Sequence, residues 1–342
     1  MEQYTEHDTL QLLELINIPI INDDTNYWFV RTNSGTKFED FYFKNYIAIA
    51  WDRLNDLEFI KEGNNDLLKQ QVEQAYPQET KPGSIASQIM RFVNEMKIGD
   101  YVMIPGTNCD RIAFGQITGD IYLYEPTFEE KLDLLSSGEE LSFLKRRNVK
   151  WLTDYPFERN ELDPMLIPII YSYGTIVNAN PYSTFINRTL YSQYYHKGML
   201  HSIIDVNKRT NISLVDFNNL INGVFSTLHY YSDISGFEVD ESELSIKATI
   251  NSPGPVEIIT ASTSVFICLS AITLFLNGAN IDFSFNIINV INGKIKIDAP
   301  GLLDKIQNII RLSKDDKQLK ENEKTLLESK ERLEIKKKKK KK

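Results

Sequence analysis

Short runs of aromatic and aliphatic residues, of the kind that form β-strands, follow one another between polar segments in the first half of the chain. Clusters of turn residues at 33–35, 99–100 and 119–120 separate several of these runs. The predicted strands are 27–31, 46–51, 100–105, 111–118, 121–124 and 148–152. Many short strands favour a small, partly closed β-barrel, because closure removes the sheet edges that would otherwise pair with other chains.

Two stretches in this half have the period of a helix instead. Residues 9–21 carry leucines and isoleucines at helical spacing, which predicts a short leading helix that packs on another part of the chain. Residues 66–96 show the same spacing, interrupted at Pro77 and again at Pro82 and Gly83. We therefore expect two helices inserted among the strands of the barrel.

The second half has a different pattern, which predicts a separate α+β domain. Residues 199–206 and 244–250 are predicted strands, and 214–228 is a predicted amphipathic helix. Further short strands are expected around Gly293 and before Pro300. The predicted fold class is α+β, with a leading helix (1–25), a β-barrel recognition domain (26–190), an α+β domain (191–301) and a charged helix with a lysine tail (302–342).

The last segment carries one row of leucines spaced by seven residues. The companion positions of this heptad are charged, so a coiled coil would lack its second apolar row. Two interpretations follow, a homo-oligomer joined through this helix or a single solvated helix, and we favour the second. The leucines of this row are Leu312, Leu319, Leu326 and Leu333. Lys336–Lys342 is expected to be a solubilising or anion-attracting tail.

The stretch 258–276 raises the question of a membrane, since it has no charged residue and is long enough to span one. A single span would place the two halves of the protein on opposite sides of the bilayer. The stretch also contains several serines and threonines, which a buried helix tolerates readily. We favour a buried core helix near 258–276, with a membrane span as the alternative.

Composition is typical of a globular protein and limits its partners. The net charge is −9, with the acidic excess in the first half, which argues against tight binding to the phosphate backbone alone. The two cysteines, Cys109 and Cys268, form no recognisable disulfide or zinc motif. No basic-then-apolar signal peptide opens the chain. A cytoplasmic location is expected.

Motifs for catalysis are missing from the sequence. The four histidines have neither the spacing of a metal site nor that of a nucleophile and its base; His196 and His201, five residues apart, are a weak metal candidate. The segment 34–37 is similar to the end of a phosphate-binding loop, but the first glycine of that motif is missing. We therefore predict no catalytic residues, no metal and no cofactor.

Aromatic residues at strand positions are the main candidates for binding, since an accessible aromatic ring can stack on a base for ~1–3 kcal/mol. All three tryptophans lie in the first half, accompanied by arginines. Each of these aromatic residues could equally fill the core of the barrel. The predicted base-binding residues are Trp28, Arg31, Trp51, Arg91, Tyr122 and Trp151.

The order of these segments resembles the N-terminal module of Mrr-type restriction proteins, a PUA-like module related to EVE domains. The resemblance covers about residues 26–190 and rests on short blocks, which include YWFVR at 27–31, IAIAW at 47–51, GDYV at 99–102, FGQITGDIY at 114–122 and RNVKW at 147–151. It implies a β-barrel that examines nucleic acid, in some relatives a modified base turned out of the helix. The nuclease domain that those restriction proteins carry has no counterpart in the pattern of residues 191–342.

Three functions remain open. The first is a non-catalytic sensor of DNA or RNA, with or without a modified base, in bacterial antiviral defence. The second is an interaction or membrane-associated effector for which the barrel is only a scaffold. The third is a metal-dependent nuclease or other enzyme whose active site is dispersed along the sequence.

Overall fold

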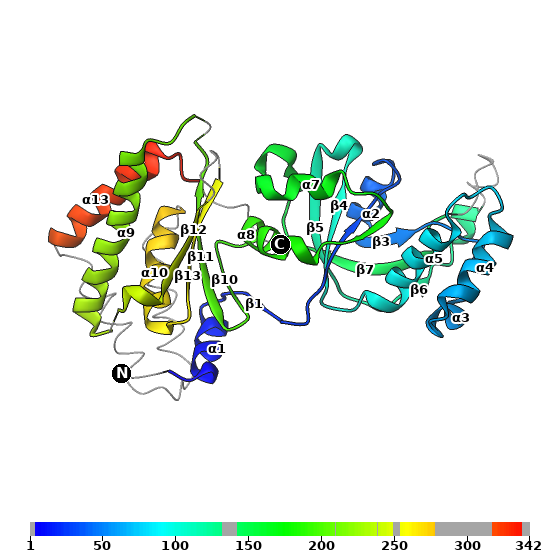
Figure 1. Ribbon diagram of the computed structural model, residues 1–342, viewed down its shortest axis with the longest axis horizontal. Coiled ribbons are helices and arrows are strands. Elements are labelled where there is room, and N and C mark those ends of the chain that lie inside the picture. Colours follow the sequence, from blue (N-terminus) through cyan, green and yellow to red (C-terminus); the bar gives the residue numbers. More distant parts are fainter. Residues whose placement is uncertain are drawn as a thin grey trace. The chain divides into compact units, whose positions relative to one another are not determined.

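The computed structural model describes residues 4–131, 142–208, 210–237, 239–248, 254–277 and 317–336. Residue contacts divide the chain into two compact units. The central unit is built from Asp24–Phe185, and the composite unit combines Met1–Asp23 with Ile186–Lys338. Both units contain helices as well as strands, so the predicted α+β class is confirmed (Figure 1).

The central unit contains one curled sheet that forms a half-barrel. Its strands follow the order β3-β7-β5-β4-β2-β9, with β6 paired to β7 and β8 paired to β5. Only β2 and β4 run parallel; the other neighbours are antiparallel. The strands are β2 (Tyr27–Val30), β3 (Tyr46–Ile49), β4 (Tyr101–Pro105), β5 (Arg111–Ile117), β6 (Tyr122–Leu123), β7 (Lys145–Trp151), β8 (Phe157–Glu158) and β9 (Ile176–Asn178).

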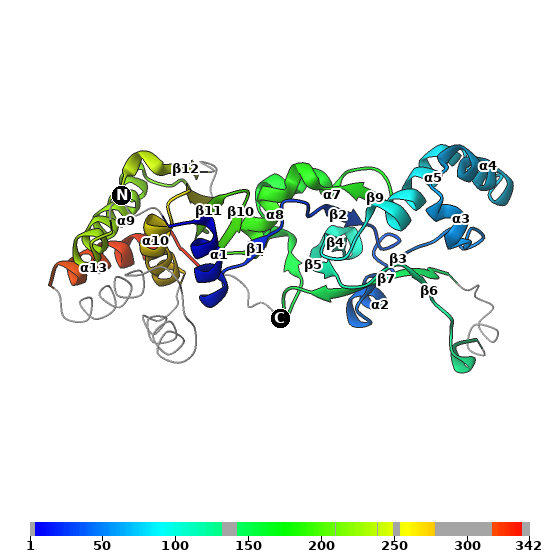
Figure 2. The ribbon, with the colours of Figure 1, turned by 90° about the horizontal axis from the view of Figure 1, so that it is seen from below.

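Helices share the apolar core of this half-barrel with its strands. The two helices predicted within 66–96 are present as α4 and α5, and Asn64 caps α4 by accepting a hydrogen bond from the N–H of Leu67. Apolar residues of α3, α4 and α5 pack against the inward side chains of β3 and β4 in one core. The helices are α2 (Phe38–Phe43), α3 (Leu57–Lys61), α4 (Asn65–Ala75), α5 (Pro82–Met90) and α7 (Ile167–Ile170). Helices α3–α5 lie together at the β3–β7 end of the unit (Figures 1 and 2).

The π-helical turn η1 (Arg91–Glu95) connects β7, the neighbour of the edge strand β3, with β9 at the opposite edge of the sheet. Arg147 on β7 donates from Nε to the carbonyl of Phe92 at 2.9 Å and from Nη2 to that of Val93 at 3.0 Å. Arg91 donates to the carbonyl of Ile176 on β9 at 3.3 Å. Side-chain hydrogen bonds that η1 makes or accepts thus link β7 and β9, two strands that do not pair with each other.

The composite unit has a five-stranded sheet in the order β1-β10-β11-β13-β12, in which only β1 and β10 are parallel. Helices α9, α10 and α13 cover one face of this sheet (Figures 1 and 2). The leading helix α1 belongs to this unit, where Leu12 and Leu13 are fully buried. Its elements are α1 (Glu6–Leu15), β1 (Ile20–Ile21), β10 (Gln193–His196), β11 (Met199–Val206), α9 (Leu214–Ser235), β12 (Leu244–Ala248), β13 (Gly254–Thr260), α10 (Thr263–Leu276) and α13 (Lys317–Arg332). The boundary between the units falls within α8 (Ser183–Leu190).

The uncharged stretch 258–276 contains two elements, not the single helix that we predicted. Ile258–Thr260 completes β13, and α10 begins after Ser262, whose side chain accepts a hydrogen bond from the N–H of Val265. Val265, Phe266 and Leu269 of α10 are buried against the rest of the unit. Among the described residues, no helix has both the length and the apolar character needed to cross a membrane.

The three leucines of the C-terminal row that the structure describes pack inside the composite unit, instead of forming a seam for a second chain or lying on a solvated helix. Leu319, Leu326 and Leu333 are at most 2% exposed, because α13 packs along α9. Gly223 on α9 permits this close packing, since a Cβ atom there would lie only 3.0 Å from a side-chain carbon of Leu326. A seam between two chains, a solvated helix and packing within one chain can all show this heptad pattern. Only the contact with α9 distinguishes them. Leu312, and the strands predicted near Gly293 and Pro300, lie outside the described residues.

This packing gives a prediction about stability. The substitution Leu326→Ala is expected to lower the free energy of unfolding by about 2–5 kcal/mol, because it leaves a cavity between α9 and α13. The neighbouring Leu327 is 45% exposed, so Leu327→Ala is the matched control and should change it by less than about 0.5 kcal/mol. Urea denaturation measures both. A Leu326→Ala protein that keeps wild-type stability but changes its oligomeric state would contradict this packing.

Candidate nucleic-acid interface

Two of the predicted base-binding residues are core residues. Trp28 and Trp151 are each 2% exposed, and each indole N–H has a partner inside the central unit. Trp28 donates to the carboxylate of Asp100 at 2.8 Å, and Trp151 donates to the carbonyl of Tyr42 at 2.7 Å. Neither ring presents a face to a ligand, so the structure corrects the prediction for both.

Two more of them, Arg31 and Arg91, hold a loop in place. The guanidinium of Arg31 donates to the carbonyls of Ile170, Ser172 and Gly174, and Arg91 donates to that of Ile176. These hydrogen bonds satisfy the backbone at the entry to β9. The hydrogen bonds shown for both arginines go to main-chain carbonyls, so the structure gives both a role in shaping this loop.

The remaining two, Trp51 and Tyr122, are half-buried, and both are tied to the first residues of β7. The carbonyl of Trp51 accepts a hydrogen bond from the amine of Lys145 at 3.0 Å. Tyr122 on β6 pairs with Arg146 in the adjacent ladder. Both residues therefore contact the start of β7, Trp51 through the inward-pointing Lys145 and Tyr122 through the strand pair on the outward side.

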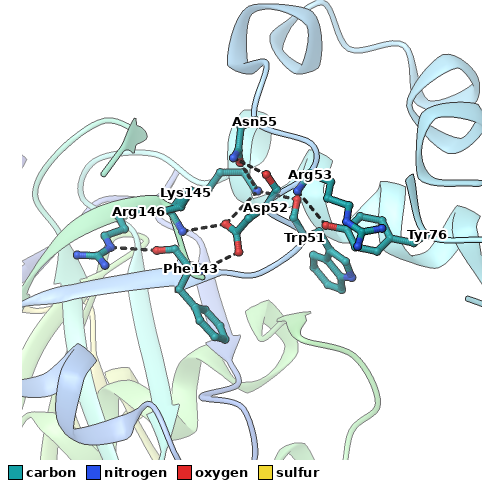
Figure 3. A network of polar contacts seen from close by, with 9 residues as sticks. Trp51, Asp52, Arg53, Asn55, Tyr76, Phe143, Lys145 and Arg146 are labelled. Carbon is teal, nitrogen blue, oxygen red and sulfur yellow. Dashed lines mark hydrogen bonds and ion pairs between the residues drawn. The ribbon is translucent and has the colours of Figure 1, made fainter. Parts of the chain in front are cut away.

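A buried polar network supports the Trp51 side of this region (Figure 3). The amine of Lys145 lies 2.8 Å from Oδ1 of Asn55 and 3.7 Å from the carboxylate of Asp52. The Asp52 carboxylate also accepts hydrogen bonds of 2.9 Å from the N–H groups of Phe143 and of the residue that follows it. Figure 3 shows the indole of Trp51 turned away from this carboxylate. The network fixes the segment after β3 against the start of β7.

The Lys145 side chain is fully buried, which is unusual for a lysine. Burial lowers its pKa to about 8, and the nearby charge of Asp52 opposes part of that shift. Its donors are directed at Trp51, Asp52 and Asn55. Lys145 therefore cannot reach a phosphate group in this arrangement.

Arg146, the next residue, points to the other side of β7 and lies between two tyrosine rings. Its guanidinium carbon is 4.1 Å from the centre of the Tyr46 ring and 3.5 Å from that of Tyr124. Tyr122 donates from its hydroxyl to Oδ1 of Asn148, which is exposed on the same side of the strand. Cationic, aromatic and amide groups thus meet on the outward side of β7. These are the groups that stack on bases and hydrogen-bond to their edges.

Sequence reasoning missed Lys145, Arg146 and Asp52. The predicted strand began at 148, because three charged residues and no apolar ones occupy 145–147. The signal was available in the composition of that segment, KRRNVK, which is basic within an acidic half of the chain. Its inward and outward positions became distinguishable only from the pairing of Lys145 with Ile49 and of Arg147 with Ile47.

The composite unit has a buried charged cluster of its own. Glu257 on β13 is 0% exposed and accepts hydrogen bonds from Nδ1 of His201 at 2.7 Å and from the Tyr194 hydroxyl at 3.1 Å. Arg188 lies 3.7 Å away. Burial would raise the pKa of Glu257, but the hydrogen bond from His201 holds it below its ordinary value. His201, a weak metal candidate in the sequence, is engaged here with one carboxylate, and no group of metal-ligating side chains is found in the described part of the chain.

Comparison with known proteins gives a single match. A family model described as a domain of unknown function, DUF8426, matches residues 28–165. That span lies in the central unit and includes Trp51, Tyr122 and Arg146, but it covers less than half of the chain. No curated protein and no solved structure matches the chain.

The buried lysine predicts how the stability of the protein changes with pH. Because the pKa of Lys145 is about 8 in the folded protein and 10.5 ordinarily, the unfolded chain binds more protons between these two pH values. Stability contributed by this group therefore rises with pH across that window. The difference in unfolding free energy between the wild type and Lys145→Met should increase by up to about 3 kcal/mol from pH 7.5 to pH 10.5. Urea denaturation at several pH values measures it, and a flat or falling difference would show that Lys145 is not buried as described.

Proposed function

We propose that the central unit binds nucleic acid through a region that we call the β7 site. It comprises residues on both sides of the start of β7: Trp51 on the side of Lys145, and Tyr122, Tyr124, Arg146 and Asn148 on the outward side. The observation that carries the proposal is the position of Arg146 between two tyrosine rings at the accessible side of β7. The two rings cover the faces of the guanidinium, so Arg146 offers a ligand its positive charge and the N–H groups at its edge, beside accessible aromatic rings.

The distribution of charge favours contacts with bases over contacts with the phosphate backbone. Of the four cations on β7, Lys145 and Arg147 are buried and hydrogen-bonded inside the unit. Arg146 and Lys150 are the ones left accessible. The ligand that fits this arrangement is an unpaired base, because the bases of an intact duplex are covered by their own stacking.

The resemblance to PUA-like and EVE-like modules supports the same proposal, and we include that finer fold assignment in it. On this basis the whole protein would act as a non-catalytic sensor of foreign or modified nucleic acid, as in bacterial antiviral defence. The composite unit would then carry the response. Its buried Glu257 cluster and apolar core give it the character of a folded domain of its own.

Binding can be tested by fluorescence anisotropy with labelled single-stranded DNA, single-stranded RNA and duplexes, each with and without modified bases. Trp51→Ala and Arg146→Ala are each expected to weaken the binding of single strands about five- to a hundredfold. With two accessible cations, the slope of log affinity against log salt concentration should be only about −1 to −2.

The chain offers a matched control for this experiment. Arg159 lies over the ring of Tyr171 elsewhere in the central unit, so Arg159→Ala removes a similar arginine–tyrosine pair. That variant should bind as the wild type does. If no oligonucleotide binds at micromolar concentrations, or if Arg146→Ala and Arg159→Ala behave alike, the β7 site is not a nucleic-acid interface. The central unit would then be better explained as a scaffold for an interaction protein.

A further inference from the structure

Trp51 has a backbone conformation that a bulky residue rarely adopts. Its φ is 62°, in the left-handed region that is uncommon for residues other than glycine, asparagine and aspartate. Such a conformation persists only where the surrounding structure holds it, and it is found most often at functional sites. The position of the indole therefore depends on whatever fixes this backbone.

Lys145 is one of the two groups that hold the Trp51 carbonyl, and it is the one that comes from outside the turn. The Trp51 carbonyl accepts two hydrogen bonds of 3.0 Å, one from the amine of Lys145 and one from the N–H of Leu54. The same amine contacts Asn55 at 2.8 Å, and Asn55 in turn donates to the carbonyl of Asp52 at 2.5 Å. One buried amine thus ties together both ends of the tight turn 51–55 (Figure 3).

We infer that Lys145 is the positioning residue for Trp51: it holds the left-handed turn 51–55 from inside the unit and so sets the direction in which the indole meets a base. This inference rests on the proposed binding of nucleic acid by the β7 site. Lys145 itself does not touch the ligand, because its side chain is fully buried. Its influence passes through the Trp51 carbonyl and the Asn55 side chain.

This role differs from that of Arg146, although the two residues are adjacent. Arg146 is accessible and can attract a phosphate, so its removal should lower both the affinity and the salt dependence of binding. Lys145 is neutralised within the protein by Asp52, so its removal should lower the affinity and leave the salt dependence unchanged. Salt titration thus separates positioning from direct electrostatic contact.

A double-mutant cycle tests the inference directly. The full-length wild type, Lys145→Met, Trp51→Ala and the double variant are compared for binding of a labelled single-stranded oligonucleotide at pH 7. Lys145→Met alone is expected to weaken binding about as much as Trp51→Ala, between five- and a hundredfold. In the Trp51→Ala background the same substitution should cause less than a twofold further loss, because there is no indole left to position.

The control cycle pairs Lys145→Met with Tyr122→Ala, which lies on the other side of β7. Here the two losses should multiply, since Lys145 does not position Tyr122. Losses that multiply in the Trp51 cycle, or a salt slope that falls as it does in Arg146→Ala, would overturn the inference. The proposed function would survive that result, because it fails only if the wild type does not bind or if Arg146→Ala has no effect.

Loss of a buried amine could also prevent folding, which circular dichroism would reveal. In that case Asn55→Ala replaces Lys145→Met in the cycle, because it removes one acceptor of the amine and leaves the amine in place. A loss that disappears in the Trp51→Ala background supports the inference. A loss that multiplies with that of Trp51→Ala refutes it.

Discussion

Lys145 and Arg147 point from β7 into the interior of the central unit, where a charged side chain is costly to bury unless acceptors surround it. The local structure supplies those acceptors. The turn 51–55 provides the carbonyl of Trp51 and the side chains of Asp52 and Asn55 for Lys145. The π-helical turn η1 provides two carbonyls for Arg147. Through these hydrogen bonds, the two buried cations hold the turn 51–55 and η1 against β7.

The same constraint shapes the site on the outside of the strand. Because successive side chains of a strand point to opposite faces, placing Lys145 and Arg147 inward turns Arg146 and Asn148 outward. Arg146 then covers the ring of the buried Tyr46 and meets Tyr124. The Nη1 atom of Arg147 has no hydrogen-bond partner among the described residues, so the inward face keeps one donor unused. The outward position of Arg146 and Asn148 on β7 therefore follows from the inward position of Lys145 and Arg147, whose hydrogen-bond acceptors lie in the interior.

Much of the fold could be predicted from the sequence, because short apolar runs and helical spacing report directly on burial. The strands around 27–31, 46–51 and 111–118 and the helix beginning at 214 were predicted and are present. The start of β7 was missed, since a buried Lys145 or Arg147 looks like a solvated charge until its acceptors are known. The prediction for the leucine row of α13 was wrong because its packing partner, the face of α9 around Gly223, lies far away in the sequence.

The candidate site was harder to predict than the fold. A tryptophan in a strand has the same sequence pattern whether it fills the core, as Trp28 and Trp151 do, or remains partly accessible, as Trp51 does. Arginines such as Arg31 suggested contact with a ligand, but their donors are directed at backbone carbonyls. Only contacts between distant segments separate these roles, and a single sequence does not contain them.

The central claim is that accessible aromatic residues around the start of β7 contact bases. Photo-crosslinking of the full-length protein to a single-stranded oligonucleotide that contains 5-iodouracil, followed by mass spectrometry of the peptides, tests this contact most directly. The account predicts adducts on Trp51, Tyr122 or Tyr124. Adducts confined to the composite unit, or to the exposed Tyr171 and Tyr173 of the loop that Arg31 holds, would contradict it.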